Sequence, residues 1–75
     1  MSSGAYAVIL LHSTNHALRA EKVLGSAGIG TKLIPVPRQL SSDCGVCVRI
    51  GRPEREAARR ALEAAGVEID GLHDI

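Results

Sequence analysis

Two cysteines in the middle of the chain, Cys44 and Cys47, have the residue type and spacing that could carry out chemistry. They form a Cys-x-x-Cys pair that ends the polar segment "PRQLSSDC" and runs directly into the apolar segment "GVCVRI". Such a pair can be a metal clip, a redox couple, or one working thiol beside a bystander. The elements that hold the two thiols decide between these three chemistries.

A redox couple or a metal clip requires both thiols to lie at one point of the fold. Thioredoxin-type pairs lie in the first turn of a helix, whereas this pair precedes and enters a predicted strand. A structural zinc site needs four ligands, which the two cysteines together with His12 and His16 could nominally supply. Alternation along a strand directs Cys47 away from the preceding loop. A Cys/His metal site is therefore the weaker alternative, and we expect no metal.

The composition is that of one small domain with a modest core. The chain has 75 residues, of which 45% are apolar, and Tyr6 is its one aromatic residue. We predict a single domain over residues 1–75 with a loose tail at 1–4. The net charge of +1 gives no field for nucleic acid, and the apolar run Ala5–Leu11 is far too short to cross a bilayer. We therefore expect a cytoplasmic protein, with no membrane or nucleic-acid partner, whose thiols stay reduced.

Hydrophobic periodicity predicts four strands and two helices. The predicted strands are Tyr6–His12, Thr31–Val36, Val46–Ile50 and Val67 to about Leu72. Ser13 or Thr14 is the expected N-cap of a helix that continues to about Ala27, and "GRPERE" opens the second helix. Gly28 and Gly66 follow the two helices at matching places, as helix-ending glycines do.

The order of these elements predicts the fold. The sequence β-α-β-β-α-β with two similar helix-Gly-strand junctions is typical of two right-handed split βαβ units. We therefore predict an α+β, ferredoxin-like sandwich, with an antiparallel four-stranded sheet in the order 4-1-3-2 and both helices on one face. Pro35 assigns the second strand to a sheet edge.

This topology predicts which residues surround Cys44. The end of the first strand, the start of the first helix and the loop that ends in Cys44 share one sheet edge. The positive end of the helix dipole favours a thiolate there, and we expect His12, Ser13, His16, Arg38 and Ser42 to support it. Gly45 gives the backbone freedom to present the thiol, whereas the neighbouring Asp43 raises a thiol pKa. An ordinary exposed thiol remains the alternative.

Cys47 is predicted to face the other way. It alternates with Val46 and Val48, so if these valines face the helices, Cys47 points to the open sheet face as a small filler. The first strand is apolar on both faces, which predicts that the open face is covered in a homodimer. The alternative is that Tyr6 and its neighbours on that face are half exposed.

The segments "HSTNHALRAEKVL", "AGI" and "KLIPVPRQLSSDCGVCVRI" resemble the selenium/sulfur (Se/S) carrier protein-like family. The resemblance runs from Tyr6 to about Ala65 and is specific at the His-Ser-Thr turn and at "PVPRQLSSDCG". It implies a carrier role in which Cys44 is the functional residue. His12, Ser13 and Arg38 match the family pattern without a role that the resemblance assigns. The chain departs from better-established small sulfur carriers, which have Cys-Pro at a helix start.

The expected function is a sulfur or selenium carrier that holds a persulfide or perselenide on Cys44. Its expected partners are a cysteine desulfurase or selenium donor protein and an acceptor enzyme, and it needs no cofactor. As an enzyme it would be at most a small sulfurtransferase, since the sequence has no convincing triad or phosphate loop. The rival function is a non-catalytic ferredoxin-like binding module.

Overall fold

Four strands form one antiparallel sheet in the computed structural model, which describes residues 5–40 and 45–75. The strands are β1 (Tyr6–Leu10), β2 (Lys32–Pro35), β3 (Val46–Gly51) and β4 (Gly71–Asp74). They lie in the order β2-β3-β1-β4, and every neighbouring pair is antiparallel. This is the predicted sheet, with β2 at an edge and Pro35 as its last residue. The predicted tail at 1–4 lies outside the described residues.

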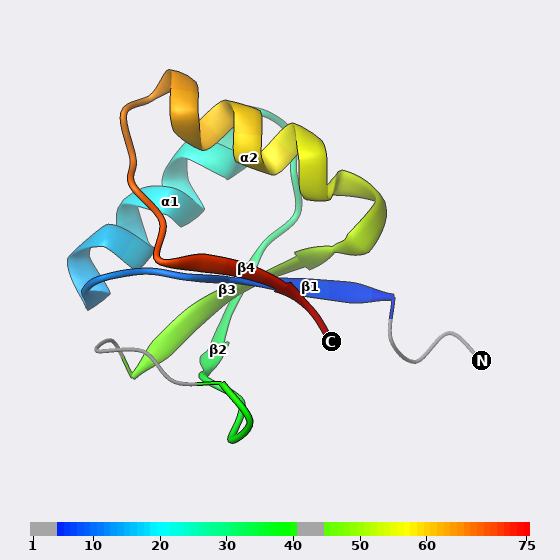
Figure 1. Ribbon diagram of the computed structural model, residues 1–75. Helices are drawn as coiled ribbons and strands as arrows, with labels where there is room; N and C mark the ends of the chain where they lie inside the picture. Colours follow the sequence, from blue (N-terminus) through cyan, green and yellow to red (C-terminus); the bar gives the residue numbers. More distant parts are fainter. Residues whose placement is uncertain (1–4, 41–44) are drawn as a thin grey trace.

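Both helices cover the same face of the sheet (Figure 1). They are α1 (Thr14–Ser26) and α2 (Arg55–Ala64), and a short 3-10 turn, η1 (Arg52–Glu54), leads from β3 into α2. Pro53 lies in this turn, where its missing N–H costs no helical hydrogen bond. The predicted α+β sandwich is therefore confirmed. No helix in the described ranges is long and apolar enough to cross a membrane.

The main core lies between the helices and the sheet. Alternate residues of β1 point toward the helices, and the predicted apolar face of α1 meets them. The apolar residues of α2 are only partly buried: Ala58 and Leu62 are buried, whereas Ala57 is exposed. The fully buried members of this cluster include Ala7, Ile9, Leu11, Ala17, Ala20, Leu24, Val48, Ile50, Ala58 and Leu62.

A second apolar cluster lies on the opposite face of the sheet. It consists of Val8, Leu10 and Cys47, which are 0%, 4% and 0% exposed. The chain itself packs further side chains against the cluster, namely Ile34, Val36, Leu40 and Ile75. The expectation of half-exposed residues is therefore wrong for Val8 and Leu10 and holds for Tyr6, which is 42% exposed. The homodimer stays a prediction, but Val8 and Leu10 are already buried within a single chain.

The two helices end in the same way, as the internal repeat predicts. Gly28 and Gly66 have φ angles of 80° and 73°, in the left-handed region. The next residue in each case returns a backbone hydrogen bond into the helix, from Ile29 N to Leu24 O and from Val67 N to Leu62 O, both at 2.9 Å. This is the Schellman arrangement, which satisfies carbonyls at the helix end and needs a residue without a Cβ.

Replacing Gly66 with Ala is expected to lower the free energy of unfolding by about 1 kcal/mol or more, because Ala is strained at positive φ. Gly45→Ala is the matched control, since Gly45 has no positive φ and an added Cβ would meet no atom of residues 5–40 or 45–75 within 4 Å. Urea denaturation of both variants measures the difference. Equal stabilities would contradict this account of the helix ends.

The last strand begins later than predicted. The expected strand started at Val67, whereas β4 spans Gly71–Asp74. The turn at Gly66 places Val67, 6% exposed, in the main core beneath the helices. The residues after Val67 connect the helical layer to the sheet, where Asp70 N donates to Leu10 O at 2.7 Å. An apolar residue after a helix-ending glycine was therefore misread as a strand residue.

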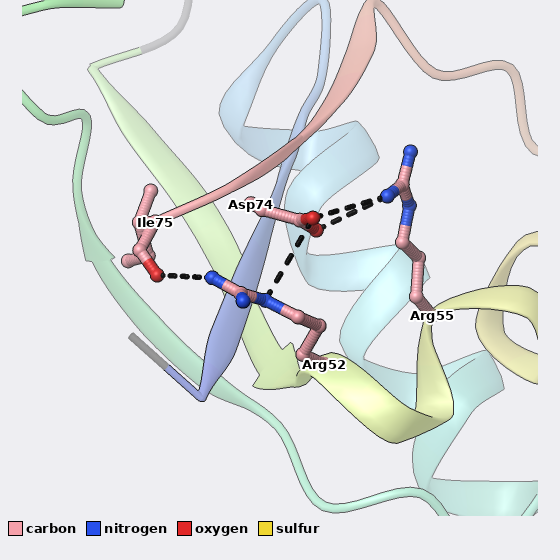
Figure 2. Close-up of polar contacts among 4 residues, drawn as sticks. All are labelled: Arg52, Arg55, Asp74 and Ile75. Carbon is pink, nitrogen blue, oxygen red and sulfur yellow. Dashed lines mark hydrogen bonds and ion pairs between the residues drawn. The ribbon is translucent and has the colours of Figure 1, made fainter. Parts of the chain in front are cut away.

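Polar contacts connect the end of β4 to η1 and to the start of α2 (Figure 2). Arg55 Nη1 lies 3.2 Å from Asp74 Oδ1, and Arg52 Nε lies 3.7 Å from Asp74 Oδ2. Arg52 also donates to the backbone oxygen of Ile75 at 2.8 Å. These contacts hold Ile75 where it packs against the second cluster.

Candidate functional site

The end of β1, the end of β2 and the start of β3 lie at the same end of the sheet, as the topology predicts. Leu10 at the end of β1 pairs with Cys47, and Pro35 at the end of β2 pairs with Val46. Val36 N donates to Gly45 O at 3.3 Å, so the pairing continues one step into the β2–β3 connection. In Figure 1 α1 and β3 begin at this same edge. Cys44 and Ser42, predicted as site residues, lie outside the described residues.

The start of α1 is fixed by Ser13. Its hydroxyl oxygen accepts a hydrogen bond from His16 N at 3.3 Å, which makes Ser13 the N-cap. The same oxygen lies 2.7 Å from His16 Nδ1. When the hydroxyl donates to Nδ1, the neutral imidazole carries its proton on Nε2. The predicted cap is thus confirmed, and it orients the ring of His16.

His12 turns toward the far side of β1. Its Nδ1 lies 3.9 Å from Asp70 Oδ1, and Asp70 directly precedes β4. β4 and β3 flank β1 on opposite sides. The contact with Asp70 therefore directs the ring of His12 away from β3, the strand that follows Cys44 in the sequence. Asp70 is not an expected neighbour of His12, because the predicted last strand, Val67 to about Leu72, contains it.

Arg38 and Gly45 flank the segment that contains Cys44. Arg38 is exposed in a turn that closes with a hydrogen bond from Leu40 N to Pro37 O at 3.0 Å. Gly45 does not have the positive φ that would require glycine. The prediction that Gly45 supplies special backbone freedom therefore finds no support in its own geometry.

Cys47 lies on the sheet face opposite the helices, as its alternation predicts. It is 0% exposed, and its Sγ lies 3.9 Å from the backbone oxygen of Pro35. His12 and His16, whose ring centroids are 6.1 Å apart, lie at the start of the helical layer. The residues that the structure describes contain no cluster of three or more metal-ligating side chains. Cys47 is thus a packing residue, and the zinc site loses one of its four nominal ligands.

A shallow groove of about 580 Å³ opens beside His12. Leu62, Val67 and Ile69 give it apolar walls, and Arg59, Glu63 and Glu68 add charged groups. The groove lies at the end of α2, on the β4 side of the molecule. It is the feature that a non-catalytic binding module would use.

The arginines of α2 form ion pairs with carboxylates of the same chain. Arg59 Nη2 lies 2.6 Å from Glu56 Oε2, and Arg60 Nε lies 3.7 Å from the same oxygen. The hydrogen bond from Arg59, followed by its charge, lowers the pKa of the Glu56 carboxyl. The pair therefore stabilises the fold above the ordinary carboxyl pKa, and this contribution is lost as the pH falls through the lowered value.

Comparison with known proteins identifies the family. The family model described as "Putative Se/S carrier protein-like" matches residues 6–74. The chain belongs to this family. The match spans all four strands and both helices, so the Se/S carrier protein-like domain includes the sheet edge and the connection that contains Cys44. No curated protein and no solved structure matches the chain.

Proposed function

We propose that this Se/S carrier protein-like chain carries sulfur or selenium on Cys44 and passes it to an acceptor protein. The observation that supports the proposal most is the family match over residues 6–74. The fold adds a second support, because Val36 and Gly45 pair at the base of the connection that contains Cys44. A reactive thiol on such a connection can enter the pocket of another protein while the sheet stays intact.

The proposed chemistry is a thiol exchange without net oxidation. The Cys44 thiolate attacks the outer sulfur of a donor persulfide, R–S–S⁻. A new S–S bond forms on Cys44, the donor S–S bond breaks, and its electron pair leaves with the donor thiolate. An acceptor thiolate then attacks the outer sulfur on Cys44 and releases the Cys44 thiolate. The same exchange with a donor perselenide, R–S–Se⁻, forms the S–Se bond of Cys44–S–Se⁻ while the donor S–Se bond breaks and the donor thiolate leaves, and neither step requires a cofactor or a metal.

Neighbouring residues support this chemistry through charge and proton position. α1 begins at the same edge as β3, and the positive end of its dipole favours an anion nearby. His16 is the proposed acceptor for the thiol proton through Nε2, in the tautomer whose Nδ1–H donates to Ser13 Oγ, and exposed Arg38 is the proposed counter-charge. His12 has a weaker claim, because its ring faces Asp70.

The expected setting follows from the same chemistry. A carrier thiol must stay reduced until it meets its donor, which favours the cytoplasm. The partners would be a cysteine desulfurase or a selenium donor protein, and an acceptor enzyme. The groove beside His12 favours the alternative of a non-catalytic binding module.

Incubation with a cysteine desulfurase and L-cysteine, followed by intact-mass measurement, tests the carrier function. A small-molecule polysulfide serves as a second donor that needs no protein docking. We expect the protein to gain the mass of one sulfur atom with either donor, and Cys44→Ser to gain none. The matched control is Cys47→Ala, which leaves only a small cavity and should still be loaded.

Two outcomes would contradict the proposal. Loading of Cys44→Ser to the level of the wild type would remove Cys44 from the chemistry. Failure of both donors to load the wild-type protein would favour the binding module.

A further inference from the structure

Positive charge is unbalanced on the sheet face opposite the helices. The described carboxylates lie on the helical segments, in the α2–β4 connection, or at Asp74, which contacts Arg52 and Arg55. The opposite face carries Lys32 and Arg49, which share the strand parity of Cys47. Within the described ranges, neither residue forms an ion pair. Figure 2 shows the contrast, since Arg52 and Arg55 both contact a carboxylate.

The two cations stand directly opposite each other. Lys32 of β2 pairs in register with Arg49 of β3, and like charges at such positions destabilise a sheet. The Arg49 guanidinium lies 4.3 Å from the centre of the Tyr6 ring, which stabilises it in place of an anion. A shallow hollow of about 170 Å³ lies beside these three residues. An approaching carboxylate would remove the unfavourable pairing.

Apolar groups continue along this face from the pair toward the other end of β2, and a further cation lies in the turn beyond it. Ile34 and Ile75 are half buried on the same face. Val36 and Leu40 pack there too, which brings the turn that holds exposed Arg38 onto this side, below the sheet in Figure 1. Partly exposed apolar side chains with charged groups around them are typical of a protein interface.

We propose that this face docks an acidic surface of a partner protein. The inference rests on the proposed function for its purpose, since a donor or acceptor docked there would contact β2 and β3, the two strands joined by the connection that contains Cys44. A second copy would bring two more cations to the contact and none of the described carboxylates on this face, so charge favours an acidic partner while the homodimer stays a prediction. Nucleic acid fits less well, because Tyr6 is the one aromatic residue and the patch is largely apolar.

Mapping backbone amide shifts by NMR against defined probes tests the docking. The acidic probe is a short peptide rich in Glu and Leu, and its matched control has Gln at every Glu position. We expect the acidic peptide to shift the amides of Lys32, Ile34 and Arg49, and high salt to weaken the binding. Lys32→Glu combined with Arg49→Glu should weaken it by at least about tenfold.

A second double variant controls for net charge. Lys22→Glu with Arg60→Glu makes the same charge change on the helices and should bind like the wild type. Lys32→Gln with Arg49→Gln should also lose affinity, and it removes charge without adding a carboxylate. Cys44→Ser should bind the acidic peptide as the wild type does. Failure to load Cys44 with sulfur would therefore contradict the carrier function without contradicting the docking proposal.

Four results would overturn the docking proposal. The first is a set of shifts on α2 instead of the sheet, and the second is binding of the acidic peptide no tighter than that of its Gln control. The third is equal weakening by the two Glu double variants, which would reduce the effect to net charge. The fourth is tighter binding of a single-stranded oligonucleotide than of the peptide, which would make the face a nucleic-acid surface.

Discussion

Replacing Ile9 with Ala is expected to lower the free energy of unfolding by about 2–5 kcal/mol. Ile9 lies in the central strand β1, is 1% exposed, and pairs with Val48 and Leu72 on its two sides. It belongs to the main core between the sheet and the helices, so truncation leaves a cavity. A domain of this length has a total stability of roughly 4–11 kcal/mol. One truncation could therefore remove half of it.

Urea denaturation at neutral pH measures this loss. Ile9→Val removes a single methyl group and should cost only about 1 kcal/mol. Leu18→Ala is the exposed control, because Leu18 is 48% exposed on α1, and it should change stability by less than about 0.5 kcal/mol. If Ile9→Ala were as stable as Leu18→Ala, the main core would not be where the structure puts it.

Replacing Val8 with Asp is expected to unfold the protein or to cost about 4 kcal/mol or more. Val8 is 0% exposed in the second cluster, on the sheet face away from the helices. A carboxylate there would be buried among apolar side chains, a large penalty that the cross-strand neighbours Arg49 and His73 would offset only in part. Circular dichroism and urea denaturation measure the effect.

Tyr6→Asp is the matched control, because Tyr6 lies on the same face of β1 and is 42% exposed. It should remain folded. Equal stabilities of the two variants would contradict burial of Val8. Sedimentation of the wild type adds a separate test of the homodimer, since a monomer mass at every concentration would exclude that prediction.

Much of the fold could be predicted because its signals are local. Each helix ends at a glycine with positive φ, and Ser13 caps α1 as its residue type suggests. The last strand could not be placed, because Val67 is apolar for a different reason: it returns to the core after the helix end. The second cluster was also missed, since its cover comes from Leu40 and Ile75, which are far away in the sequence.

The site was predictable as far as strand alternation and topology reach. Alternation places Cys47 on the face opposite the helices, where the structure has it buried. Side-chain direction was not predictable for His12, because its neighbour Asp70 depends on where β4 begins. The cross-strand pair of Lys32 and Arg49 required the register of β2 against β3, which the sequence pattern does not specify.

The most direct test of the carrier function is to locate the transferred sulfur. After loading by desulfurase and L-cysteine, alkylation under native conditions traps the persulfide, and trypsin releases residues 39–49 with both cysteines. Fragmentation between Gly45 and Val46 then separates the two thiols. The carrier account predicts the extra sulfur on Cys44, with buried Cys47 unmodified. Sulfur on Cys47, or on neither cysteine, would contradict it.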